Sequence, residues 1–126
     1  MDRRQPDSME KGVGMVFNRN LIFDNSDDFF EQRGTAIMKL SPAAAQEVCN
    51  KAFLQGLVVS RIEGGIWHDP GFEARGDCIW DGADPPMSDT TAKANNQEAS
   101  DFVRSAQANH DVFVVTTVSL TGAPFI

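Results

Sequence analysis

The residues best suited to chemistry lie in one acidic stretch in the second half of the chain. A histidine and an aspartate are adjacent there and further carboxylates follow: His68, Asp69, Glu73, Asp77, Asp81 and Asp84. Imidazole nitrogens and carboxylate oxygens are ordinary ligands of divalent metals, so a small metal-dependent hydrolase built on His68 is one interpretation. The spacing matches neither a helical zinc motif nor a calcium loop. A solvated acidic face is therefore favoured, and no metal or cofactor is expected.

Two other catalytic arrangements have little support. Asp77 and Asp81 could share acid–base work, but residues four apart on one strand are about 13 Å apart, too far for a glycosidase pair. Cys78 could be a nucleophile, yet strand alternation places it beside Trp80 on the apolar side, where a buried thiol is inert. Cys49 has the same interpretation on a helix. We therefore expect no catalytic residues and a protein that is not an enzyme.

The distribution of charge is more informative than any catalytic motif. The chain of 126 residues has a formal net charge of −7. Between residues 63 and 89, seven acidic residues are opposed by Arg75 alone, which is a net charge of −6. Such a balance argues against binding to nucleic acid or to an anionic membrane, since both need a positive surface. It suits a basic protein partner.

Clustered carboxylates beside a tryptophan and two proline-containing turns are typical of a protein-binding surface. Charge complementarity speeds encounter, and an aromatic residue supplies a local hot spot. The candidate partner-binding residues are Trp67, Asp69, Glu73, Arg75, Asp77, Asp81 and Asp84. In the alternative interpretation the acids only keep the protein soluble and both tryptophans are core residues. A core position is favoured for Trp80.

The elements that must position these residues are short and mixed. Residues 1–12 predict a flexible lead-in, and residues 13–126 one domain. Its first half suggests short strands at 13–17, 21–23 and 35–40, with a capped helix near 26–31 between them. A longer helix follows from Pro42 to about Gln55, with Ser41 as N-cap and Gly56 just past its end. Its register buries Cys49.

The second half is dominated by strands. A strand over 57–63 should turn at Gly64-Gly65, and a second turn is expected at 69–71. Along the strand 72–81, alternation places Glu73, Arg75, Asp77, Ile79 and Asp81 on one face. A loop over 82–87, a helix over 88–109 and a central strand over 112–120 complete the chain. The predicted fold is a single α+β domain, with a mixed sheet packed by two main helices.

Two counts indicate the compartment. The chain has only two cysteines, which is no disulfide framework, and its first residues lack the apolar run of a secretory signal. No stretch approaches the roughly 18 to 20 apolar residues that a membrane-spanning helix needs. We expect a cytoplasmic protein with both thiols reduced.

A short motif adds a family resemblance. Residues 77–82 have the sequence DCIWDG, Asp84-Pro85-Pro86 follows, and a β-prone run begins at Val112. This pattern, over about residues 35–120, resembles small immunity proteins of bacterial polymorphic toxin and contact-dependent growth inhibition systems. The resemblance implies an antitoxin that binds and neutralises a cognate toxin domain, often a nuclease. A non-toxin protein-binding adaptor remains an alternative, as does the hydrolase.

Overall fold

The computed structural model describes residues 22–31, 38–68 and 71–122. Predictions for residues 1–12 and for a strand at 13–17 lie outside these ranges, so the flexible lead-in and the domain boundary at residue 13 stay predictions. The described elements follow in chain order: β2 (Ile22–Phe23), α1 (Ser26–Glu31), β3 (Lys39–Leu40), α2 (Pro42–Lys51), the 3-10 turn η2 (Phe53–Gln55), β4 (Leu57–Trp67), β5 (Phe72–Asp81), α3 (Asp89–Ala106) and β6 (Val112–Ser119).

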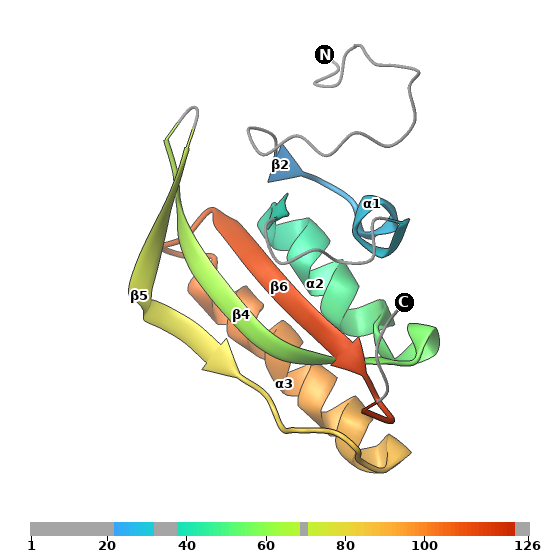
Figure 1. Cartoon of the computed structure of the whole chain (residues 1–126). Helices are drawn as coiled ribbons and strands as arrows, with labels where there is room; N and C mark the ends of the chain where they lie inside the picture. The colour runs from blue at the N-terminus through green and yellow to red at the C-terminus, as the bar shows by residue number, and fades with distance from the viewer. Residues whose placement is uncertain (1–21, 32–37, 69–70, 123–126) are drawn as a thin grey trace.

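One five-stranded sheet organises these elements, in the order β2-β3-β6-β4-β5. β2 pairs with β3 in parallel, and the other neighbours are antiparallel. The two longer helices, α2 and α3, lie side by side against one face of the sheet (Figure 1). The core between the layers includes Val48, Ile62, Val103 and Phe113. This arrangement confirms the predicted α+β fold with a mixed sheet and two main helices.

Helix boundaries follow the predicted capping residues. The hydroxyl of Ser41 accepts the N–H of Ala44 at 3.2 Å and begins α2. The α-helix ends at Lys51, earlier than predicted, because the chain tightens into η2 before it leaves through Gly56 with φ +76°. Cys49 is buried, as expected. Ser88 caps α3 in the same way as Ser41 caps α2, through the N–H of Thr91.

The turn predicted at Gly64-Gly65 is wrong. β4 continues through both glycines to Trp67, which pairs with Phe72 of β5, and the N–H of His68 donates to the carbonyl of Gly71 at 2.8 Å. The glycines serve packing instead. A Cβ at Gly64 would collide with the Cys78 Sγ, and one at Gly65 with the Glu73 carbonyl oxygen. They allow β5 to approach β4 closely.

Candidate functional site

The pairing of β4 with β5 contains one large irregularity. Gly65 pairs with Ala74, and Glu63 pairs with Ile79. Between these two pairs, Gly64 is the single residue on β4, whereas residues 75–78 provide four residues on β5. β5 therefore bulges outward at this point, and its regular alternation is interrupted.

The bulge changes which face each β5 side chain occupies. Alternate β4 residues from Arg61 to Gly65 pair in unbroken register with β6, so they lie on one face. Directly paired residues share a face, which places Ala74, Ile79 and Asp81 there as well. Ala74 and Ile79 are five residues apart, and regular alternation would place residues an odd number apart on opposite faces. Glu73 consequently projects from the opposite face to Ile79 and Asp81, and the prediction of one face for all of them is wrong.

The first cluster, which we call the Ile79 face, comprises Arg61, Glu63, Ile79 and Asp81. It lies on the side of the sheet opposite α2 and α3, because Ile62, the neighbour of Arg61, packs into the core between the sheet and these helices. The Arg61 guanidinium contacts Glu63 Oε2 at 3.2 Å through Nε and Asp81 Oδ1 at 2.7 Å through Nη1. Arg61 was not predicted as a site residue, since only the hairpin pairing shows that it faces Asp81.

The second cluster, the hairpin-end cluster, comprises His68, Glu73 and Arg75. His68 Nε2 lies 2.6 Å from Glu73 Oε1, and Arg75 Nε lies 3.2 Å from Glu73 Oε2. The pKa of Glu73 lies below its usual range, mainly because of the hydrogen bond from His68 and secondly because of the charge of Arg75. This carboxylate is thus engaged on both oxygens by neighbours on its own hairpin.

Replacing His68 with alanine should raise the pKa of Glu73 towards its ordinary value, because the larger of the two stabilising contacts is lost. The pKa of Glu73 is lower in the folded state than in the unfolded state. The contact therefore stabilises the fold at pH values above the unfolded-state pKa, and this stabilisation is lost as the pH falls through the folded-state pKa. A carbon-detected NMR titration of the Glu73 carboxyl measures this shift. Asp101 is the internal control: its low pKa arises from Gln97 and Arg104, and should not move.

The other predicted partner-binding residues are spread along the molecule. Trp67 is half-buried at the end of β4, where its backbone N–H donates to Asp111 Oδ1 at 2.8 Å. Asp77 and Asp84 are exposed, and no ion pair joins either of them to another described residue. Asp69 lies outside the described residues. The ends of β5 pair with Arg61 and Trp67, six strand steps or roughly 20 Å apart, and Asp84 lies beyond the strand, so the predicted residues form a line rather than one compact patch. Trp80 packs against the core, as favoured.

Two buried asparagines on α3, which the sequence analysis missed, bond to the backbone of β4, and one of them, Asn95, also holds the loop that carries Asp84. Asn95 Oδ1 accepts the N–H of Ala83 at 2.8 Å, and its Nδ2 donates to the Val59 carbonyl at 2.8 Å. Asn96 Oδ1 accepts the N–H of Val59 at 2.9 Å. The only hint of these contacts in the sequence is that two adjacent asparagines interrupt the apolar side of the helix.

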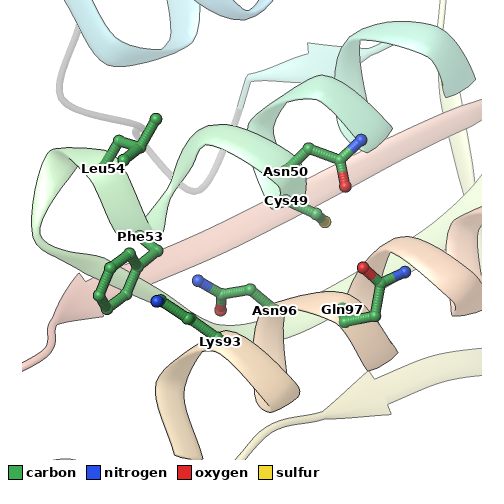
Figure 2. A pocket seen from close by; sticks show the side chains of 7 residues that line it. All are labelled: Cys49, Asn50, Phe53, Leu54, Lys93, Asn96 and Gln97. Carbon is green, nitrogen blue, oxygen red and sulfur yellow. The ribbon is translucent and has the colours of Figure 1, made fainter. Parts of the chain in front are cut away.

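A hollow of about 260 Å³ lies between α2, η2 and α3. Figure 2 shows Phe53 and Lys93 at one end of it, with the Lys93 Nζ 5.0 Å from the centre of the Phe53 ring. Burial raises the pKa of the Cys49 thiol to about 12, so this thiol is not a nucleophile at neutral pH.

The hydrolase interpretation needs several metal ligands around His68. Within residues 22–31, 38–68 and 71–122, no three His, Cys, Asp or Glu side chains are grouped closely enough to hold a metal ion. Of the predicted ligands, only Glu73 contacts His68 there.

In the same ranges, none of the helices has the length and apolar character needed to cross a membrane.

Comparison with known proteins connects this fold to a family. The sequence model described as Colicin-E5 Imm protein matches residues 38–118, which run from just before β3 to the end of β6. The chain belongs to the colicin-E5 immunity protein family. The family match contains both clusters on the β4–β5 hairpin and the two asparagines of α3. The resemblance to immunity proteins of toxin systems is therefore confirmed.

Individual relatives agree with this assignment. An immunity protein named CdiI from Burkholderia pseudomallei is 60% identical over 100 residues, which cover 79% of this chain and 92% of the relative. The colicin-E5 immunity protein of Escherichia coli is 36% identical over 80 residues, covering 63% of this chain and 96% of the relative. A second relative from E. coli, named colicin-E5 immunity protein in ColE9, matches to the same extent. The protein is thus an immunity protein, whose role is to neutralise a cognate toxin.

Proposed function

We propose that this immunity protein neutralises a nuclease toxin, and that it covers the basic nucleic-acid cleft of the toxin with the acidic side of β5 and the loop that follows. The observation that carries the proposal is the concentration of seven carboxylates between residues 63 and 89, in a chain of net charge −7. Relatives named for colicin E5 support a colicin-like toxin as the partner.

The mechanism follows from electrostatics. A nuclease holds the phosphates of its substrate with Lys and Arg side chains. Exposed carboxylates such as Asp77 and Asp84, which no described cation neutralises, can occupy the positions of those phosphates. Long-range attraction then raises the association rate, and salt weakens it. Asn95 supports this role, because it holds the backbone at Ala83 next to Asp84.

The test is the affinity for the toxin domain encoded next to the immunity gene, measured by calorimetry over a salt series. We expect the affinity to fall at least ~10-fold between low and high salt, because exposed charges are screened. The double variant Asp77→Asn/Asp84→Asn should weaken the affinity by roughly 3- to 10-fold, because it slows association. Glu98→Gln removes an exposed carboxylate from α3 and is the matched control, expected to bind unchanged.

Two results would contradict this proposal. Failure of the unaltered protein to bind the toxin domain would remove the proposed partner. Tight binding that neither salt nor the double variant affects would show that the carboxylates are only a solvated face, and the acidic mechanism would fall.

A further inference from the structure

Exposed apolar side chains identify a more specific docking surface. Two large hydrophobic residues are notably exposed in the described part of the chain, Leu54 at 83% and Ile79 at 39%. Leu54 lies on the short turn after α2, beside the hollow that contains Lys93. Ile79 lies on β5, at the edge of the sheet, on the face away from α2 and α3. The two residues thus mark different sides of the molecule.

The surroundings of Ile79 are ordered and charged. Its direct partner on β4 is Glu63, and Arg61 joins Glu63 to Asp81 through two ion pairs. The arginine therefore holds two carboxylates next to the isoleucine, Glu63 across the strand pair and Asp81 two residues further along β5. An apolar side chain within a rim of positioned polar groups is the usual anatomy of a binding hot spot.

We propose that the toxin docks on the Ile79 face, with Ile79 entering an apolar depression whose rim carries basic side chains. The inference rests on the proposed function and adds which side of the hairpin makes the contact. Because the bulge at residues 75–78 reverses the alternation, Asp81 belongs to this interface and Glu73 does not. The hairpin-end cluster lies on the other side and plays no direct part.

Charge favours a basic partner over other occupants. Each ion pair of Arg61 uses one carboxylate oxygen, Glu63 Oε2 and Asp81 Oδ1, so the second oxygen of each carboxylate can receive an incoming cation. Two carboxylates against one guanidinium leave the face negative. A second copy of this chain would bring another net charge of −7 and be repelled. Leu54, by contrast, neighbours the cationic Lys93, which suits a basic partner poorly.

The test compares truncations of the two exposed apolar residues in binding to a catalytically inactive form of the adjacent-gene toxin domain. Ile79→Ala should weaken binding by roughly 30- to 100-fold, the range of a hot-spot residue. Leu54→Ala, the more exposed of the two positions, should change it less than ~3-fold. Thermal melting of both variants shows whether the fold is retained.

A second pair of variants keeps the test independent of packing at Ile79. Asp81→Asn should reduce the association rate several-fold, whereas Glu73→Gln should not, although both residues are acidic and exposed on the same strand. Equal binding by Ile79→Ala and the unaltered protein would overturn the proposal, as would a larger loss in Leu54→Ala or in Glu73→Gln. Absence of binding by the unaltered protein would instead contradict the proposed function itself.

Discussion

Replacing Asn96 with alanine should lower the free energy of unfolding by about 3 kcal/mol, since two buried backbone groups lose their partner. Asn96 is 4% exposed. Its Oδ1 accepts the N–H of Val59 at 2.9 Å, and its Nδ2 donates to the carbonyl of Leu57 at 3.2 Å. Chemical denaturation followed by circular dichroism measures the change.

The reason for this large effect lies in the length of the strands. β5 ends at Asp81, which pairs with Arg61, so none of the described strands pairs with the first residues of β4 on that side. Backbone groups there would be buried and unpaired if α3 did not supply Asn95 and Asn96 in place of a strand. The asparagines therefore continue the hydrogen bonding of the sheet beyond the end of β5.

The neighbouring residue provides the control. Gln97 is exposed on α3 and donates to Asp101, a neighbour on the same helix, at 3.0 Å. Gln97→Ala should therefore change the free energy of unfolding by no more than about 0.5 kcal/mol. If Asn96→Ala were as mild as Gln97→Ala, the hydrogen bonds to β4 would not be the source of stability that we assign to them.

Replacing Gly64 with alanine should lower the free energy of unfolding by about 2 kcal/mol, because the added methyl group meets a filled core. Its Cβ would collide with the Cys78 Sγ and lie 3.0 Å from the Phe113 ring. Both of these side chains are buried and belong to the main core cluster. Equilibrium unfolding in urea measures the cost.

Two further variants separate steric conflict from a general effect of losing a glycine. At Gly76 an added Cβ meets nothing within 4 Å, so Gly76→Ala should be close to neutral. Cys78→Ala removes the nearer obstacle, so the cost of Gly64→Ala should be smaller in that background. Additive effects of Gly64→Ala and Cys78→Ala would contradict close packing as the reason for the glycine.

Local sequence signals predicted most of the elements correctly. Ser41 and Ser88 cap the two long helices, and Gly56 ends the turn after α2, because capping depends on residues within one turn of each other. The same local logic failed at Gly64-Gly65. Two adjacent glycines are equally compatible with a turn and with close strand packing, and only the positions of Cys78 and Glu73 decide between them.

For the candidate site, too, some properties follow from the sequence and others only from the tertiary structure. The sequence by itself determined the charge of −7, its concentration around one hairpin and the motif that resembles immunity proteins. Only the tertiary structure decided that Glu73 and Asp81 lie on opposite faces and that Arg61 pairs with Asp81. Alternation along a strand is a local rule. A bulge, however, is set by how two strands pair, so one irregular segment reassigns every side chain beyond it.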